Sequence, residues 1–143
     1  KDIKVKGQDK NYLQQKLVVY QLMQRRLEEL QQQAMLIERK YKELETTKQT
    51  LGDMKKLKKT DEVFFPLGNG VYAKGNVSND KKLFVELGAG LVTNKTPETA
   101  TKFIEGKEKE MEKSAKEVQT EIEDTISKLN GIGEELRAAS GQQ

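Results

Sequence analysis

Residues 63–75 read Val-Phe-Phe-Pro-Leu-Gly-Asn-Gly-Val-Tyr-Ala-Lys-Gly, and a related pattern returns twenty residues further along the chain. There, residues 84–92 read Phe-Val-Glu-Leu-Gly-Ala-Gly-Leu-Val, which align with residues 64–72. In each copy, Gly-x-Gly separates two short apolar runs, which is typical of two strands joined by a tight turn. The repeat therefore predicts two β-hairpins in tandem, with four short strands, within residues 61–95.

The two hairpins need a partner surface to become stable. Their apolar residues are too few for an independent core, and isolated hairpins are marginal in water. We expect the strands to complete a barrel between subunits; the alternative is a small sheet packed against the chain's own helices. The candidate oligomerisation residues are Phe64, Phe65, Val71, Val77, Leu83, Val85 and Leu91. The glycines predicted to form the turns are Gly68, Gly70, Gly88 and Gly90.

The segments that flank this insert are predicted to be long helices. Residues 11–60 contain no proline and no glycine before Gly52, and residues 96–139 open with Thr96-Pro97-Glu98, a typical helix start. Apolar residues recur at the a and d positions of a heptad in both segments, as in a coiled coil. The seam of the first comprises Leu13, Tyr20, Met23, Leu27, Leu30, Ala34, Ile37, Tyr41, Leu44 and Leu51. The seam of the second comprises Ile104, Met111, Ala115, Val118, Ile122, Thr125, Leu129, Ile132 and Leu136.

Two heptad helices joined by a compact insert are expected to pair in antiparallel fashion, so that a positions of one meet d positions of the other. The register we predict places Met23 opposite Leu136, Leu27 opposite Ile132, Leu30 opposite Leu129, Ile37 opposite Ile122, Tyr41 opposite Val118 and Leu44 opposite Ala115. It also places Arg26 beside Glu135 and Lys40 beside Glu121. Charged residues interrupt the two seams at Lys16, Lys48 and Glu108. Because a slide of one heptad preserves the seam, the register is open to within a heptad.

Composition argues against an enzyme. The chain contains no His and no Cys, so the usual general base, thiol nucleophile and zinc ligands are missing. We expect no cofactor and no metal. No apolar run approaches the roughly 20 residues that span a bilayer, and the lysine-rich start lacks the apolar stretch of a signal peptide. We therefore expect a cytoplasmic protein that binds no membrane.

Charge is distributed unevenly, although the net charge is only +3. Residues 1–59 carry 15 basic and 8 acidic side chains, whereas residues 97–143 carry 7 and 11. This asymmetry makes the two helical segments electrostatically complementary to each other. The mildly basic total charge is only weak evidence for nucleic-acid binding. The lysine run at residues 55–59 lacks an aromatic platform for bases, so we interpret it as a solvated helix end.

Residues 68–73 fit the dinucleotide fingerprint Gly-x-Gly-x-x-Ala in form. The mechanism of that motif requires a helix directly after the glycines, whose backbone amides meet the pyrophosphate. A strand is predicted there instead, so the glycines are interpreted as turn formers.

A helix, an insert with paired Gly-x-Gly turns and a second helix resemble the alpha class of the prefoldin family, of the archaeal type. The resemblance rests on residues 63–75 and on Val85-Glu86-Leu87-Gly88-Ala89-Gly90, and it covers nearly the whole chain. It implies an α+β fold: a long antiparallel two-helix coiled coil with a two-hairpin insert that oligomerises into a β-barrel platform. It also implies a hetero-hexamer of two alpha and four beta subunits. Such a hexamer would hold non-native polypeptides at its coiled-coil tips without using ATP and pass them to a group II chaperonin.

The start of the first helix carries more apolar residues than a two-stranded coil can bury. Residues 17–23 are apolar around most of the helix, whereas pairing with one other helix covers a single stripe. We interpret the surplus as a client-binding patch; the alternatives are packing within the tip or adventitious association. The candidate client-binding residues are Leu13, Leu17, Val18, Val19, Leu22, Ile132 and Leu136. The competing function is a structural coiled-coil oligomer or a filament-forming prefoldin-like protein without client transfer.

Overall fold

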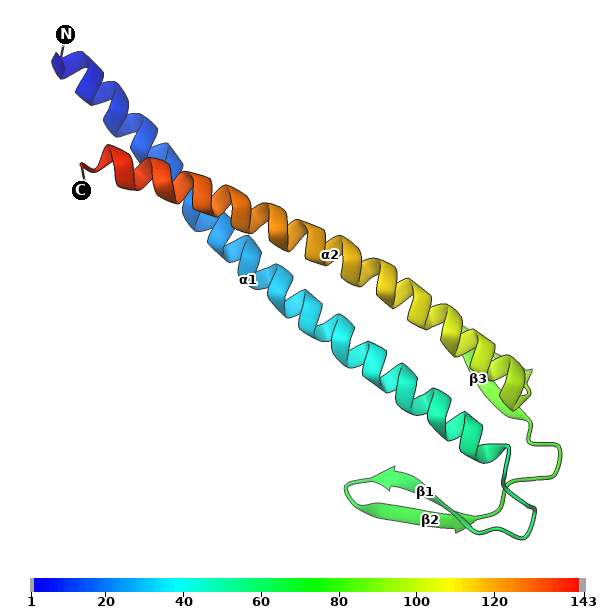
Figure 1. Ribbon diagram of the computed structural model, residues 1–143. Helices are drawn as coiled ribbons and strands as arrows, with labels where there is room; N and C mark the ends of the chain where they lie inside the picture. Colours follow the sequence, from blue (N-terminus) through cyan, green and yellow to red (C-terminus); the bar gives the residue numbers. More distant parts are fainter. Residues whose placement is uncertain (1, 142–143) are drawn as a thin grey trace. The chain divides into compact units, whose positions relative to one another are not determined.

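The computed structural model describes residues 2–141, with side chains described from Lys10 onward. Two long helices flank four short strands (Figure 1). The elements are α1 (Asp2–Met54), β1 (Val63–Gly68), β2 (Val71–Gly75), β3 (Leu83–Gly88), β4 (Leu91–Lys95) and α2 (Pro97–Ala139). The predicted α+β fold, with helices on either side of two hairpins, is confirmed.

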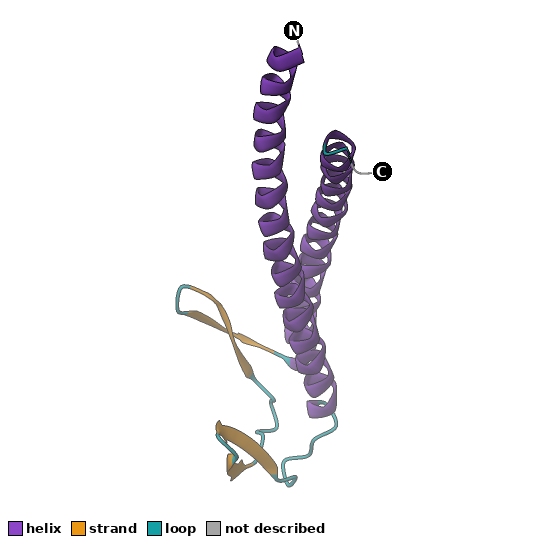
Figure 2. Cartoon of the chain, turned by 90° about the vertical axis from the view of Figure 1, so that its left-hand side faces the viewer, coloured by secondary structure: helices purple, strands orange, loops and turns teal. Residues whose placement is uncertain are grey.

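The chain comprises two compact units. The first, the paired-helix unit, contains the described residues up to Arg39 and from Glu112 onward. In this unit the two helices run side by side in antiparallel directions, as two views at right angles show (Figures 1 and 2). The second, the hairpin unit, spans Lys40–Met111 and contains the remaining parts of both helices together with all four strands.

The twenty-residue repeat is preserved in the backbone of the hairpins. β1 pairs with β2 and β3 pairs with β4, in two separate antiparallel sheets. Each ladder is interrupted one residue before the first turn glycine, between Pro66 and Gly68 in one copy and between Glu86 and Gly88 in the other. The bulge and the turn are therefore parts of one repeated design, and the tandem-hairpin prediction is confirmed.

The turn residues adopt left-handed backbone angles in both copies. Gly70 and Gly90 have φ of 79° and 78°, and the preceding Asn69 and Ala89 have φ of 50° and 51°. Positive φ at both central residues is the signature of the tight turn that matches strand twist, and it favours Asn-Gly over Ala-Gly. Ala89 therefore occupies a conformation that Asn69 adopts at lower cost.

We expect Ala89→Asn to raise the free energy of unfolding by about 0.5 to 1 kcal/mol, because alanine is disfavoured in the left-handed region. Asn69→Ala, at the equivalent turn, is the matched variant and should lower it by a similar amount. Denaturant unfolding followed by circular dichroism measures both. Equal effects of the same sign at the two turns would contradict this account.

The observed bounds of α1 differ from those predicted. The helix begins nine residues earlier than the predicted 11–60 segment and ends at Met54. Its end coincides with tertiary hydrogen bonds: the ammonium of Lys81 donates to the carbonyl of Lys55 over 2.8 Å, and the backbone amide of Lys58 donates to Asp61 over 2.7 Å. Because these partners come from later in the chain, helix propensity alone does not reveal the end.

The predicted start of α2 agrees with the structure. Pro97 is its first residue, where a missing amide hydrogen costs nothing. The Thr96 hydroxyl accepts from the Thr99 amide over 3.2 Å, and the Thr99 hydroxyl accepts from the Thr96 amide over 2.9 Å. This reciprocal cap satisfies two backbone donors at the helix terminus.

Seam residues supply most of the buried apolar side chains. They are Leu30, Leu44, Leu51, Val118, Leu129 and Ile132. Ala115 departs from its predicted seam position because it is exposed, whereas Ser114 is half-buried. A helix with 3.6 residues per turn drifts relative to a strict heptad, and neither small side chain offers enough apolar area to oppose the drift.

The predicted register of the helices is wrong by about one heptad. In the paired-helix unit, Arg26 pairs with Glu121 over 2.7 Å, whereas Glu135 lies 3.4 Å from Lys16. The Tyr20 ring also lies 3.6 Å from the Cβ position of Gly133.

In the hairpin unit, Lys48 lies 2.8 Å from Glu108, one helical turn from the Met111 that the predicted register places opposite it. Two of the charged residues that interrupt the seams therefore lie together, and a buried charge is costly without a partner.

Candidate functional surfaces

The distal part of α1 carries an exposed apolar surface in the paired-helix unit. Leu17, Val18, Val19 and Leu22 are 39% to 56% exposed, and we refer to these four residues as the distal patch. They lie outside the seam, so pairing with α2 leaves them uncovered. Leu13 and Leu136 are half-buried and Ile132 is 8% exposed, so Ile132 packs in the seam. Of the seven candidate client-binding residues, the structure therefore brings four to the surface.

The surroundings of the distal patch are nearly free of charge. Between Asn11 and Gln24 the one charged residue is Lys16. Its ammonium lies 3.4 Å from Glu135 and 5.3 Å from the centroid of the Tyr12 ring, and the Tyr12 hydroxyl donates to Glu135 over 3.0 Å. These contacts, with Tyr12 first and Glu135 second, raise the pKa of Lys16. The surroundings of the patch are thus apolar and glutamine side chains, and their single cation is paired with a carboxylate.

A further exposed apolar pair on α1 was missed by sequence reasoning. Met35 and Leu36 are 63% and 60% exposed. They occupy the two heptad positions that follow a seam residue, which a two-stranded coil leaves in solvent. The signal was present in the sequence, since two adjacent apolar residues off the seam can be recognised from the heptad alone.

The hairpins expose apolar side chains on both sheets. Phe84 is 76% exposed and its repeat equivalent Phe64 is 62% exposed, and Phe65, Val71 and Leu91 are exposed as well. Val77, Leu83 and Val85 are half-buried. Sequence reasoning missed four further exposed apolar residues, which are Leu67, Tyr72, Leu87 and Val92. Leu67 and Leu87 lie at the bulges, where the strict alternation used to select strand faces is interrupted.

One hairpin packs partly against the helices of its own unit. A hollow is lined by Leu83, Phe84 and Val85 of β3, and by Thr47, Leu51, Ala100, Phe103 and Ile104 of the helices. This packing accounts for the partial burial of Leu83 and Val85. It leaves most of the exposed apolar surface of both hairpins uncovered.

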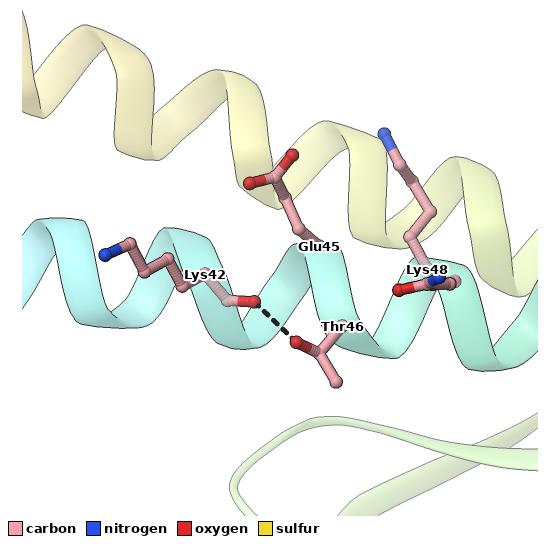
Figure 3. A pocket seen from close by; sticks show the side chains of 5 residues that line it. Lys42, Glu45, Thr46 and Lys48 are labelled. Carbon is pink, nitrogen blue, oxygen red and sulfur yellow. Dashed lines mark hydrogen bonds between the residues drawn. The ribbon is translucent and has the colours of Figure 1, made fainter.

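Charged pairs flank and enter the helix seam. The salt bridge of Arg26 with Glu121, at 2.7 Å, raises the pKa of Arg26. Lys48 donates to Glu108 over 2.8 Å, and this hydrogen bond is the main cause of its raised pKa. Figure 3 shows Lys48 extending from α1 toward α2. Lys48 lines a polar hollow together with Lys42 and Thr46. In this hollow the Thr46 hydroxyl donates to the Lys42 carbonyl over 3.0 Å.

The described residues form neither a metal-binding cluster nor a phosphate-binding motif. No group of three or more acidic residues in residues 2–141 is arranged to hold a metal ion. Strand β2, rather than a helix, follows the glycines at residues 68–70, so the dinucleotide fingerprint lacks its phosphate-binding amides. Neither described helix contains an apolar stretch long enough to cross a membrane.

Comparison with known proteins finds relatives over nearly the whole chain. The prefoldin subunit family matches residues 23–142. Prefoldin subunit alpha of Archaeoglobus fulgidus is 29% identical over 126 residues, which are 88% of this chain and 92% of the relative. Prefoldin subunit alpha of Pyrococcus horikoshii is 26% identical over 138 residues, 96% of this chain and 93% of the relative.

The fold also has a counterpart among solved structures. A chain of filamentous PFD from Methanocaldococcus jannaschii, solved by cryo-EM, superposes with a TM-score of 0.71 at 20% identity. The match covers 85% of this chain and 98% of the other. Helices, tandem hairpins and relatives over nearly the whole length lead to one assignment: this chain belongs to the prefoldin family, in its alpha class.

Proposed function

We propose that this chain is the alpha subunit of a cytoplasmic, ATP-independent chaperone that captures non-native polypeptides and passes them to a group II chaperonin. Prefoldins are non-enzymatic chaperones whose subunits oligomerise with one another. The observation that carries the proposal is the distal patch, an exposed apolar surface in nearly uncharged surroundings. Non-native chains expose apolar side chains, and such a surface binds them by burial without requiring a particular sequence.

The hairpins supply the second part of the proposal. We infer that they join two alpha and four beta subunits into a hetero-hexamer through a barrel between subunits. Their exposed aromatic residues and unpaired strand edges support this, because two-stranded sheets gain stability only when further strands or partners cover them.

An aggregation assay tests the proposal directly. A chemically denatured model protein is diluted into buffer with this chain alone, with a beta subunit alone, or with both, and light scattering is followed without ATP. We expect the mixture to suppress scattering at near-stoichiometric ratios and ATP to make no difference. Undiminished scattering with an assembled mixture would count against client capture.

A filament is the second candidate, and the filamentous assembly of the solved structural relative favours it. In this alternative the hairpins build an extended polymer and the helices bind no client. Electron microscopy of the chain with and without a beta subunit distinguishes the two: closed particles support the hexamer, and rods that lengthen with concentration support the filament.

A further inference from the structure

The lysine run at residues 55–59 lies in a loop of the hairpin unit. Because α1 ends at Met54, the run follows the helix and is not the solvated helix end that the sequence predicted. The Lys81 ammonium, from the loop between the two hairpins, donates to the carbonyl of Lys55 over 2.8 Å. A tertiary contact therefore holds the run against a second loop.

Two further hydrogen bonds join the same loops. The side-chain amide of Asn76 donates to the carbonyls of Lys59 and Asp61, each over 3.1 Å. We refer to residues 55–61 and 76–82 as the lysine loops. Together they carry six basic and two acidic side chains, a net charge of +4, whereas the whole chain has a net charge of +3. The excess positive charge of the chain is thus concentrated in these two adjacent loops.

The two acidic side chains of the lysine loops are engaged in ordering the backbone. Asp61 accepts from the backbone amide of Lys58 over 2.7 Å. Asp80 accepts from the Ser78 hydroxyl over 2.8 Å and from the Lys82 amide over 3.2 Å. These hydrogen bonds, with Ser78 first, lower the pKa of Asp80. The loops therefore have a defined conformation although they concentrate like charges.

The lysines of these loops have no carboxylate partner in the described part of the chain. None of their six ammoniums forms an ion pair there, whereas Lys40, Lys48 and Lys74 of the same unit each pair with a glutamate. All six are exposed except Lys81, which is half-buried. Like charges held close together repel one another, and a bound anion relieves that repulsion. The lysine loops are therefore suited to an anionic partner.

We propose that the lysine loops are a docking surface for an acidic, unstructured segment of another protein. A nucleic acid fits less well, because the loops contain no aromatic residue for base stacking and no arginine for bidentate phosphate contacts. Lysine ammoniums are point charges on flexible stems, so they can pair with carboxylates whose positions vary along an unstructured chain. This role goes beyond the proposed client capture, which depends on apolar burial at the distal patch.

Binding of a polyglutamate peptide to the full-length chain tests the proposal. Fluorescence anisotropy is measured with a labelled peptide of about 20 residues in about 50 mM salt, and about 300 mM salt should abolish most of the binding. The test variant combines Lys56→Gln, Lys58→Gln, Lys59→Gln and Lys82→Gln, and it keeps Lys81 because its ammonium orders the loops. We expect at least about tenfold weaker binding, since four charge pairs are lost together although each exposed pair is weak. Unchanged affinity would overturn the proposal.

The matched control makes the same change of charge on α2. It combines Lys102→Gln, Lys109→Gln, Lys113→Gln and Lys116→Gln, at exposed lysines that are interspersed with glutamates. We expect the control to bind polyglutamate within about twofold of the wild type. An equal loss in both variants would show that net charge, rather than the clustering of lysines in the two loops, attracts the peptide.

Three further measurements separate the proposal from other roles of the loops. Tighter binding of an oligothymidylate of equal length than of polyglutamate would identify a nucleic-acid surface instead. Failure of the loop variant to assemble with a beta subunit would identify a subunit contact and overturn the docking role. The variant with serine at the distal patch should bind polyglutamate like the wild type, so that loss of client capture and loss of acidic-segment binding are distinguishable.

Discussion

Replacing Leu17, Val18 and Leu22 of the distal patch by serine is expected to weaken client binding by the assembled chaperone at least about tenfold. Each side chain is roughly half exposed in the chain itself, so its remaining apolar area is available for a client. At about 25 cal/mol per Å² of buried apolar area, three such residues contribute a few kcal/mol. The assay is the suppression of aggregation as a function of subunit concentration, supported by fluorescence titration with a permanently unfolded protein.

The control for this variant is Met35→Ser with Leu36→Ser, which removes equally exposed apolar side chains elsewhere on α1. We expect the control to retain most of the activity, and both variants to retain their helical circular dichroism and their assembly. If the distal variant suppresses aggregation as well as the wild type, the client-binding assignment fails. Loss of assembly in the distal variant would instead identify the patch as structural.

Phe64→Ser together with Phe84→Ser is expected to prevent assembly while leaving the helices folded. The two rings occupy equivalent positions of the repeat and are 62% and 76% exposed in the isolated chain. Burying one such ring at an interface contributes about 1.5 to 3 kcal/mol, so losing two from each alpha subunit should raise the dissociation constant by more than about a hundredfold. Analytical ultracentrifugation of the mixture with a beta subunit measures the change.

Asn94→Ser is the matched control, since Asn94 is exposed and directly faces Phe84 in the β3–β4 ladder. It should assemble like the wild type. Intact assembly of the double phenylalanine variant would show that the hairpins do not form the subunit interface. Loss of its helical signal would show that the rings stabilise the chain itself.

The hairpin insert could be predicted from sequence because its signals are local. A tight turn is set by two or three residues, and the Gly-x-Gly pattern carries this information directly. The repeat then doubled the signal, so that β1 and β3, and likewise β2 and β4, begin twenty residues apart as expected. The same holds for the start of α2, where Thr96 and Pro97 form a cap that depends on adjacent residues alone.

The distal patch could be predicted in part. Its four exposed members follow from counting apolar residues against the capacity of one seam, which needs only the heptad. Ile132 could not be separated from them, because its burial depends on which residues of α1 it faces. The end of α1 could not be predicted for a similar reason, since the hydrogen bond at this end comes from Lys81 in the loop between the hairpins.

The sequence by itself determined that this chain forms two heptad helices around tandem hairpins and that one end of α1 carries surplus apolar residues. These properties follow from periodicity and turn chemistry, which act over a few residues. Only the tertiary structure decided the register. Apolar seam contacts are nearly the same after a slide of seven residues, so the heptad pattern does not choose between the two arrangements. The ion pairs of Arg26 with Glu121 and of Lys16 with Glu135 identify the observed one. Which charges meet across the seam is a property of the packed helices rather than of either helix alone.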